Sequence, residues 1–558
     1  MKIKHFNFIV LIISVFSIKA QQLRQPFDFP ILLSGNFGEL RNNHFHSGID
    51  FKTQGVEGKA VHAVQDGYIS RISVSPGGYG NALYLTHPNG ITTVYGHLQR
   101  FIPSIAQYVK EKQYEQENFN VNLFLTPEEF PFHEGEIIAY SGNTGSSGGP
   151  HLHFEIRDTE SEDILDPLEY FKDKIKDTRP PKIQSILVCP IKGKGIVNDS
   201  QQKVKLELIT TKDGKQTFNK KIEAWGEIGL AIKTNDYMDN TSNIYGVKEI
   251  SLYLDSIIIY HSNPNRFAFD ESRYLNSYID YEEWKLHHSF YIRSFIEPGN
   301  RLRFIKSKNH GIIHINEEKT YSLTYTLSDL LGNTTKQTIH IIGKRQEIPE
   351  ISVQGKDLFH WRSDNRFGAK GIRLTIPKGN LYNDFYFQYK VKEDSLSFAN
   401  IHILHDKPIP IHKSALLSLR LRTDTLVNKK QYGIVRIHKG KKHWIGGKYR
   451  NGWIDTSINE LGSYTISQDT KAPVITPVLS KTWMNKQRFI FRLTDNLSGV
   501  KTYRGEIDGQ FVLFEMNNQS VISYQFDKNR LKKGKHTLNL IVTDAVGNQS
   551  EYSYPFVW

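Results

Sequence analysis

The first third of the chain contains short runs in which apolar and polar residues alternate. Such alternation is typical of β-strands with one buried face. It is clear in residues 67–74, 81–86 and 135–140, and glycine-containing turns separate the runs. Residues 81–86 and 92–95 flank a turn at residues 87–90, which favours a hairpin. We therefore expect a compact antiparallel β domain over residues 27–172.

One segment of this region has a different period. Ile102, Ile105, Tyr108 and Val109 recur at helical spacing, and residues 110–118 are strongly polar. The pattern predicts a short helix and a loop within an insertion at residues 99–134. Two interpretations remain open, a segment that borders a substrate groove and a solvated insertion without function.

After residue 176 the chain is almost entirely strand-like. Pro180 and Pro181 mark a boundary, because consecutive prolines disfavour helix and interrupt sheet pairing. A weak repeat follows, since residues 329–333 and 544–548 share an Asp-x-x-Gly-Asn pattern after a strand-like run. We expect immunoglobulin-like β-sandwiches at residues 177–345 and 471–558, with a β-rich domain of unknown type at 346–470. The Asp/Asn/Gly loops favour turns over calcium binding, because they lack a full ligand set.

The N-terminus differs from the rest of the chain in polarity. Lys2 and Lys4 precede an apolar run that ends near Phe16, and Ala20 follows. This arrangement predicts a cleavable signal peptide over residues 1–20, because the apolar run is too short for a membrane anchor. Since no second apolar stretch is long enough to cross a bilayer, we expect an exported protein without a membrane span after signal removal. The location would be periplasmic or extracellular.

Net charge limits the classes of binding partner, and cysteine content limits the possible disulfides. The 558 residues carry a formal net charge of +13, which suits an anionic polymer such as cell-wall glycan or nucleic acid. No basic helix or nucleic-acid motif accompanies the charge, so cell-wall material is favoured and no nucleic acid partner is expected. Cys189 is the only cysteine, which excludes an internal disulfide.

Two short motifs about a hundred residues apart carry the candidate chemistry. His46 and Asp50 lie four positions apart with Gly48 between them, a residue that would let the backbone approach an ion closely. His151 and His153 lie two positions apart, so on a strand they project from the same face. His, Asp and His are suitable ligands for Zn²⁺, and three of them leave the fourth tetrahedral position open for water. Each motif alone is weak evidence, and the conjunction is stronger.

Taken together, these motifs resemble the lysostaphin-type zinc endopeptidases. The resemblance covers about residues 35–160 and rests on five segments in the expected order: Phe37 to Arg41, His46 to Asp50, Gly78 to Asn81, Tyr95 to Leu98, and Gly142 to Glu155. It implies a β-barrel-like peptidase domain, here residues 21–176, that cuts peptide cross-links of bacterial cell walls. The whole chain would thus be mainly β, a peptidase domain followed by β-sandwich modules. The insertion at 99–134 is longer than the family's usual connection.

The resemblance also assigns roles to single residues. It implies that His46, Asp50 and His153 bind zinc and that His97 and His151 are catalytic. Zinc lowers the pKa of its bound water to about 7, and an imidazole with a pKa of about 6.5 can transfer protons near neutrality. One of the two histidines would take the water proton and the other would bind the developing oxyanion, and which does which remains open.

Other residues near these motifs have competing interpretations. Arg41 is either a substrate contact at the rim of the site or a surface cation. His44 lacks a partner Asp four positions on, and His62 and His87 are better explained as structural histidines. Glu155 shares the face of His153, where we expect an ordinary barrel residue or a hydrogen bond to a ligand rather than metal binding.

The sequence therefore predicts a secreted zinc metalloendopeptidase that acts on peptidoglycan stem or cross-link peptides. The C-terminal β modules would hold the wall or a cell-envelope partner protein. The alternative is a catalytically silent, wall-binding or regulatory scaffold, and the complete ligand set argues against it. A zinc protease that acts on proteins remains a third possibility.

Overall fold

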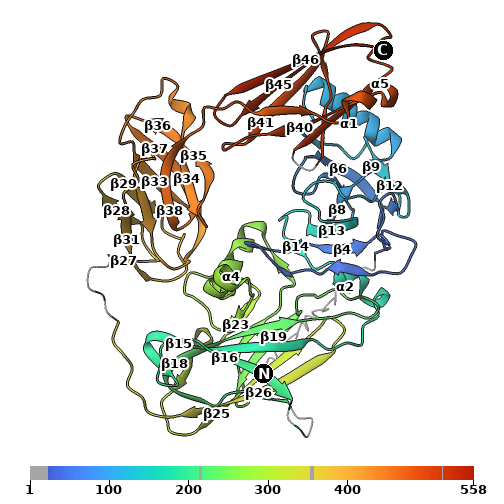
Figure 1. The fold of residues 1–558 in the computed structure, drawn as a ribbon. Coiled ribbons are helices and arrows are strands. Elements are labelled where there is room, and N and C mark those ends of the chain that lie inside the picture. Colours follow the sequence, from blue (N-terminus) through green and yellow to red (C-terminus); the bar gives the residue numbers. More distant parts are fainter. Residues whose placement is uncertain (1–22, 211, 213–215, 352, 354–356, 518–519) are drawn as a thin grey trace, which may run out of the picture.

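The computed structural model describes residues 23–558 except 211, 213–215, 352, 354–356 and 518–519, so the expected signal peptide lies outside the described residues. The chain is mainly β, as predicted, and its strands form four successive groups (Figure 1). Among the described residues, no helix is both long and apolar enough to span a bilayer.

The first group forms an antiparallel sheet and a small second sheet. The central strands of the large sheet, in spatial order, are β1 (Leu33–Gly35), β4 (Ile49–Lys52), β13 (His151–Asp158), β8 (Ile91–Leu98), β7 (Asn81–Thr86), β6 (Gly67–Val74) and β10 (Val121–Phe124). The expected hairpin is confirmed, because β7 pairs with β8. The small sheet contains β5 (Ala60–His62), β12 (Ile137–Tyr140) and β9 (Arg100–Phe101). β2 (Leu40–Arg41) and β3 (His44–Phe45) pair only with each other, whereas the short strands β11 (Pro131–Phe132) and β14 (Ile164–Leu165) pair with β6 and β13.

The predicted helix is present and is longer than its apolar pattern indicated. Helix α1 (Pro103–Glu115) begins with proline, whose fixed φ suits the first helical position, and it buries Ile105 and Val109. Its second half includes polar residues that we expected in a loop. The helix includes these polar residues in part because Gln113 is buried and donates a hydrogen bond to the Phe119 carbonyl.

The strands of the second group are hydrogen-bonded into one continuous set of eleven, and the immunoglobulin-like sandwich stays a prediction for this group. Its two longest strands bend through register shifts and connect most of the others. The main path is β17 (Gln216–Phe218), β16 (Val204–Thr210), β15 (Lys182–Val197), β18 (Ile222–Asn235), β26 (Thr334–Gly343), β25 (Thr320–Ser328), β19 (Glu249–Leu254), β20 (Ile257–Ser262) and β23 (Ile305–Ser307). Shorter elements of this group are β22 (Ile292–Arg293), β24 (Ile313–Ile315), α3 (Leu275–Tyr278) and α4 (Tyr281–His287). Two further short elements belong to the first group, namely α2 (Leu168–Phe171) and β21 (Arg266–Phe267), which pairs with β14.

The third and fourth groups each consist of paired sheets around their own apolar core. The third has a five-stranded sheet of β28 (Asn365–Ala369), β29 (Ile372–Ile376), β33 (Pro410–Arg420), β37 (Trp453–Glu460) and β36 (Lys448–Arg450). Its other strands are β31 (Tyr389–Lys392), β32 (Ile401–Leu404), β38 (Gly462–Gln468), β34 (Tyr432–His438) and β35 (Lys441–Gly446), with the pair β27 (Asp357–Phe359) and β30 (Phe385–Phe387). The fourth contains β39 (Val474–Pro477), β40 (Arg488–Thr494), β44 (Val521–Gln525) and β43 (Glu515–Asn517), then β42 (Gln510–Val512), β41 (Val500–Ile507), β45 (Lys535–Asp544) and β46 (Gln549–Val557), and helix α5 (Trp483–Lys486).

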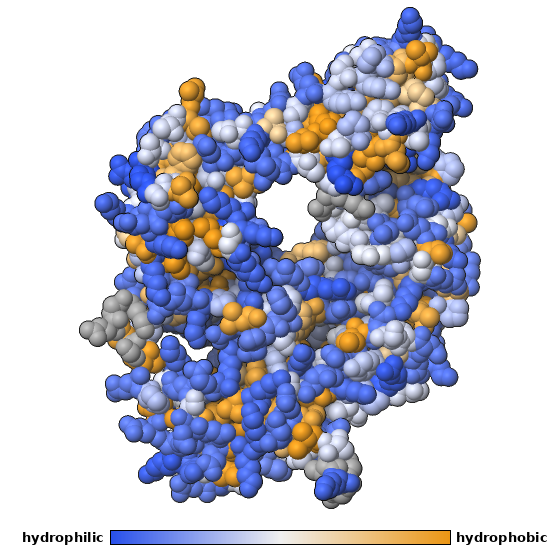
Figure 2. Space-filling view, viewed as in Figure 1, coloured by the Kyte–Doolittle hydropathy of each residue, from blue (hydrophilic) through white to orange (hydrophobic). Residues whose placement is uncertain are grey.

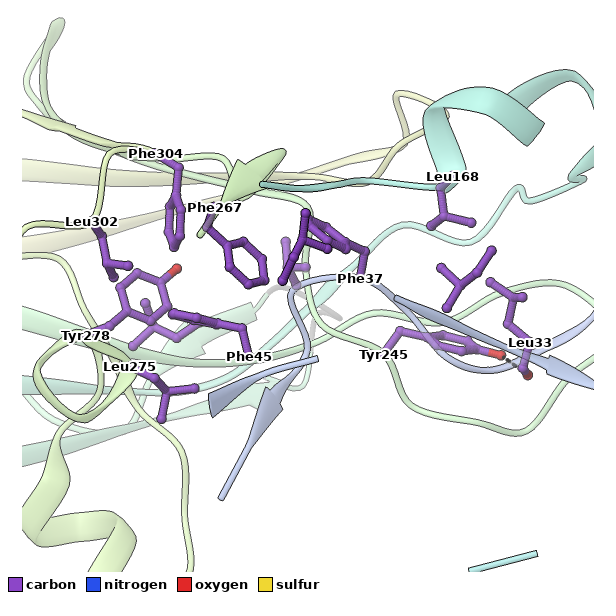
Figure 3. Packing of buried hydrophobic residues seen from close by; sticks show 14 of the residues in the cluster. Leu33, Phe37, Phe45, Leu168, Tyr245, Phe267, Leu275, Tyr278, Leu302 and Phe304 are labelled. Atoms are coloured by element: carbon purple, nitrogen blue, oxygen red, sulfur yellow. Dashed lines mark hydrogen bonds between the residues drawn. The ribbon is translucent and has the colours of Figure 1, made fainter. Parts of the chain in front are cut away.

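The first two groups share one buried core, which the sequence did not indicate. A single apolar cluster extends from Leu23 to Ile341. Figure 3 shows Phe45, which directly precedes His46, packed near Phe267 and Tyr278 of the second group. Burying one such aromatic side chain contributes about 1.5–3 kcal/mol. The segment that carries His46 is therefore held by residues of both groups.

The last group returns to the first and closes the chain into a ring. The Lys110 ammonium on α1 lies 2.7 Å from a carboxylate oxygen of Asp527, and Arg504 lies 2.7 Å from Glu117. The guanidinium of Arg530 lies 3.7 Å from the ring centroid of Tyr114 on α1. Figure 2 shows the opening that the four groups surround. Helix α1, in the insertion, is thus the contact site of the C-terminal module.

Candidate metal centre

The side chains of His46, Asp50 and His153 converge at the junction of β4 and β13. Asp50 and His153 are directly opposite each other in the antiparallel pair, and His46 lies in the turn that leads into β4. All three are buried, and each offers one ligand atom within 4.8 Å of the other two. The two motifs, remote in sequence, therefore meet at one point.

Position 48 requires glycine for a reason that the sequence did not indicate. A Cβ atom at this position would lie 2.2 Å from the carbonyl oxygen of Phe154 in β13. The close approach that requires glycine is thus between the His46–Asp50 turn and the neighbouring strand, and the expected approach of the backbone to an ion stays a prediction. The effect on the site is indirect, because this approach brings Asp50 against His153.

Hydrogen bonds behind the two imidazoles orient them toward a common point. His46 Nδ1 lies 2.7 Å from the carbonyl oxygen of Asn36, and His153 Nε2 lies 2.9 Å from Glu155 Oε1. If each of these nitrogens donates, then His46 Nε2 and His153 Nδ1 present lone pairs. These two atoms lie 3.1 Å apart, and Asp50 Oδ1 lies 3.1 Å from the first and 3.0 Å from the second. Acceptors this close together need a proton or a metal ion between them, and two imidazoles with one carboxylate fit a bound metal ion.

The protonation equilibria of these groups also favour positive charge at this point. Burial alone would raise the pKa of Asp50, but the neighbouring His46 and His153 hold it well below its usual range. Burial likewise would lower the pKa of His153, and its hydrogen bonds to Asp50 and Glu155 instead raise it to about 9. A proton or a metal ion can supply the charge, and a bound metal displaces the proton.

A second histidine pair borders the first three residues. The ring centroids of His97 and His151 lie 4.7 Å apart, and His151 Nε2 lies 3.5 Å from Asp50 Oδ1. Both rings place Nδ1 2.8 Å from a backbone carbonyl, that of Thr144 for His97 and that of Gly149 for His151. The carbonyls leave Nε2 of each ring as the free acceptor. Burial and neighbouring histidines lower the pKa of His97 to about 4, and burial lowers that of His151, so both are neutral at pH 7.

A family comparison agrees with this arrangement. The model of peptidase family M23 matches residues 44–114. This chain carries an M23 peptidase domain. The resemblance to lysostaphin-type enzymes is thereby confirmed for the N-terminal part of the chain. A second model, described as a Zu5-like domain, matches residues 356–469, which cover most of the third group of strands.

Relatives and solved structures match the same N-terminal region. The DD-carboxypeptidase/endopeptidase Mpg of Neisseria meningitidis is 37% identical over 118 residues, 21% of this chain and 21% of that protein. Peptidoglycan DD-endopeptidase ShyC of Vibrio cholerae is 29% identical over 25% of this chain and 28% of its own. The solved catalytic domain of lysostaphin from Staphylococcus simulans, with 25% identity and a TM-score of 0.20, covers 25% of this chain and 92% of that domain. The chain thus spans about a fifth of the length of the curated Mpg protein that it matches.

Arg41 lies beside the candidate metal centre. Its guanidinium is 3.4 Å from Asp50 Oδ2 and 3.3 Å from Glu39 Oε2, and 38% of its side chain is exposed. Both earlier interpretations of Arg41, a substrate contact at the rim and a surface cation, remain open. The structure adds a third role, because Arg41 is an ion-pair partner of Asp50.

The competing histidines have partners away from the metal centre. His44 is exposed and is bonded to the Asn42 carbonyl, and His62 is bonded to the Gly135 carbonyl. His87 lies between the Asp66 carbonyl and the Thr93 hydroxyl. These contacts agree with structural roles.

Glu155 makes the hydrogen bond to a ligand that the sequence allowed, since it lies 2.9 Å from His153 Nε2, but Ser47, Tyr79, Arg157 and Asn36 were missed. Glu155, behind His153, also accepts hydrogen bonds from Ser47, Tyr79 and Arg157, and the Tyr79 ring stacks on His153 with centroids 5.2 Å apart. The i+2 spacing of Glu155 and Arg157 on an alternating strand was a usable signal for their pairing. Asn36, which holds His46 through a backbone carbonyl, left no signal, because any residue type has that carbonyl.

Proposed function

We propose that this protein is an exported zinc metalloendopeptidase that hydrolyses peptide bonds in peptidoglycan stem or cross-link peptides. The observation that carries the proposal is the convergence of the His46, Asp50 and His153 acceptor atoms within about 3 Å of one another. Two imidazoles and one carboxylate are a ligand set that zinc accepts, with room for a fourth ligand. The M23 match and the peptidoglycan endopeptidases among the relatives support the same substrate class.

The residues around the ligands can supply proton transfer, oxyanion stabilisation and substrate binding. When bound, zinc supplies a water of lowered pKa and polarises the scissile carbonyl. His97 and His151 are neutral at pH 7, so one can accept a proton at Nε2 and the other, once protonated, can donate a hydrogen bond to an oxyanion. Arg41 supplies a fixed positive charge at the partly exposed edge of the site, where a substrate carboxylate could bind.

A groove lies between the M23 domain and the C-terminal module, close to this site. A cavity of about 950 Å³ is lined by Gln99, Asn143 and Thr144 of the M23 domain, by α1, and by residues of the last group of strands. Thr144 holds His97 through its carbonyl, so the groove begins next to a catalytic candidate. We propose that this groove receives the peptidoglycan peptide and that the insertion forms one of its walls.

Export and envelope binding complete the proposal. The N-terminal signal pattern and the peptidoglycan substrate both favour the periplasm or the extracellular space. The three C-terminal groups of strands, two of which we expect to be immunoglobulin-like, would bind the wall or an envelope partner. The scaffold alternative differs in one respect only, since it predicts binding without hydrolysis.

The test combines metal content with product analysis. The mature chain should hold one equivalent of zinc by elemental analysis, and mass spectrometry should detect peptide fragments released from defined muropeptides. His153→Ala should lose both zinc and hydrolysis while its circular dichroism is unchanged, and the matched control His44→Ala should lose neither. A zinc-loaded protein that binds muropeptides without cleaving any of them would refute the peptidase and support the scaffold.

A further inference from the structure

The positive charge of this chain is concentrated in the third group of strands. Residues 356–469, which match the Zu5-like family, contain 20 lysine and arginine residues and 10 aspartate and glutamate residues. The difference, a formal net charge of +10, is most of the +13 of the whole chain. Since the candidate metal centre lies in the first group, the peptidase chemistry does not account for this charge.

A cavity on this module combines aromatic rings with some of these lysines. It holds about 370 Å³ and lies where the third group meets the last group of strands. The third group contributes two aromatic and three lysine side chains, namely Trp444, Tyr449, Lys429, Lys430 and Lys448. The last group contributes the turn at Ala545 and Val546, and the Gln431 side chain donates a 2.7 Å hydrogen bond to Asn548 Oδ1 across the junction. Aromatic side chains with a few charged groups are typical of ligand sites.

Two glycines place the aromatic residues at the edges of both sheets of the module. β35 is the edge strand of one five-stranded sheet and β36 is the edge strand of the other (Figure 1). Gly446, which ends β35, and Gly447 connect them, with φ values of 85° and 143° that disfavour any residue with a side chain. The chain therefore crosses from one sheet to the other within two residues, and Trp444 and Tyr449 lie on either side of the crossing.

Trp444 is available to a ligand. It is partly exposed and does not belong to the apolar core of its module, against which Tyr449 packs. The Trp444 ring lies against the backbone of β34, because a Cβ atom at Gly433 would be 2.3 Å from two of its carbon atoms. Among the described residues, none accepts a hydrogen bond from its indole N–H, which is not buried. The ring is thus held in place while one donor stays free.

Two of the three lysines have no carboxylate partner. Lys429 is paired with Asp424, which also accepts a hydrogen bond of 2.7 Å from the Tyr449 hydroxyl. Lys430 and Lys448 are exposed, and neither forms an ion pair with any residue that the structure describes. Positive charge that the protein does not compensate attracts anions. The cavity therefore combines an aromatic surface, a free N–H donor and uncompensated ammonium groups.

We propose that this cavity binds an anionic glycan, that is, a sugar chain that bears phosphate or carboxylate groups. The C–H face of a sugar ring can pack on Trp444, and a sugar hydroxyl can accept from its indole N–H. Lys430 and Lys448 would bind the phosphate or carboxylate groups. The same side chains could stack and neutralise a nucleic acid. The choice of an envelope glycan rests on the proposed function, because it specifies the wall binding proposed for the C-terminal modules.

The test measures binding of the full chain to polysaccharide probes at low ionic strength. Isothermal titration should show binding to polygalacturonate, which carries carboxylates, or to phosphomannan, which carries phosphates. Neutral mannan should not bind measurably. Binding to only one of the two anionic probes identifies the anionic group. Added salt should weaken this binding, because it screens the contacts with exposed lysines.

Variants separate this cavity from the general charge of the module. Trp444→Ala should weaken binding by at least about tenfold. Lys430→Gln combined with Lys448→Gln should weaken it by about three- to tenfold. The matched control combines Lys370→Gln with Lys378→Gln, which removes the same charge from exposed positions outside the cavity, and should bind like the wild type. If Trp444→Ala does not fold, the two lysine pairs carry the test, because all four side chains are exposed.

Four results would overturn the proposal: no binding to either anionic glycan, equal binding of neutral mannan, equal losses in the two lysine pairs, or tighter binding of an oligothymidylate than of the glycans. Peptide release from soluble muropeptides should be the same in the wild type and in these variants. None of the binding measurements depends on hydrolysis. The glycan site can therefore fail while the peptidase proposal holds, and an inactive chain that binds the glycans would leave the site established.

Discussion

The Asn36 side chain exchanges two hydrogen bonds, of 2.7 and 2.9 Å, with the backbone of Gly246, although 210 residues separate them. The backbone carbonyl of the same asparagine lies 2.7 Å from His46 Nδ1. A residue of the second group of strands thus fixes the peptide unit that orients a proposed zinc ligand. The M23 domain is therefore not independent of the segment that follows it.

This relationship predicts that Asn36→Ala weakens zinc binding without removing a ligand. Loss of both side-chain bonds leaves the Gly246 peptide unsatisfied and costs about 1–3 kcal/mol of stability. Because the His46 ring loses its fixed orientation, zinc affinity should fall about 10–100-fold, which a competition titration with a chromogenic chelator measures. Asn42→Ala, at an exposed position, is the control, and equal affinities in the two variants would contradict the prediction.

Glu155→Gln should destabilise the candidate metal centre, because Glu155 contacts the His153 ring nitrogen that faces away from Asp50. The carboxylate is fully buried, its pKa is held well below the usual range by Arg157 and His153 against the effect of burial, and it accepts from both. Removing one charge of a buried pair costs about 3–5 kcal/mol. Denaturant unfolding should show this loss, together with weaker zinc binding. The exposed Glu160→Gln provides the comparison, and a stability difference below about 1 kcal/mol between the two would refute the prediction.

Gly48→Ala should separate β4 from β13. The new methyl group would overlap the Phe154 carbonyl oxygen, and backbone cannot move as a flexible side chain can. We expect a loss of about 1–3 kcal/mol in unfolding free energy and a loss of zinc. Gly148→Ala, where an added Cβ meets nothing within 4 Å, should match the wild type in both measurements. Retention of stoichiometric zinc by Gly48→Ala would show that the turn can adjust.

The contact between the second and third groups should weaken in acid. His412 stacks on Tyr274 with centroids 4.2 Å apart, and burial, then Lys413 and Arg273, lower its pKa to about 4. The unfolded chain, with a pKa of about 6.5, binds this proton first. The stabilising contribution of neutral His412 is therefore complete above pH 6.5 and is lost as the pH falls toward 4.

Urea unfolding at pH 7, 6 and 5 tests this expectation. His412→Phe keeps the ring stack and should reduce the dependence of stability on pH by at most about 1 kcal/mol per pH unit. His443→Phe, at an exposed position, should leave the dependence unchanged. Identical slopes in all three proteins would exclude His412 as the responsible group.

The closed ring should depend on the Lys110–Asp527 pair. Asp527 is largely buried, and reversing one charge puts two like charges 2.7 Å apart. Lys110→Glu or Asp527→Lys alone should open the ring and increase the radius of gyration in small-angle scattering. The double variant should restore part of the contact, with a coupling energy of about 1 kcal/mol. An unchanged radius in both single variants would show that the Arg530–Tyr114 and Arg504–Glu117 contacts suffice.

The sequence predicted many of the local elements and pointed to three residues that the structure brings together. Alternation identified β6, β7 and β12. The two motifs meet because β4 pairs with β13 and places Asp50 opposite His153. The polar half of α1 was assigned to a loop, since its outer face is covered by a module far along the chain. Periodicity reports that a face is buried and not what buries it. The core shared through Phe45 and the Asn36–Gly246 bonds could not be found for the same reason.

The contact between α1 and the last module joins residues 387 positions apart, Glu117 and Arg504. During synthesis the M23 domain is finished long before its distant partner leaves the ribosome. Newly made chains must therefore pass through a stage in which the catalytic region is folded and the groove lacks one wall. A protein interrupted before the final strands would keep that earlier, more open form permanently.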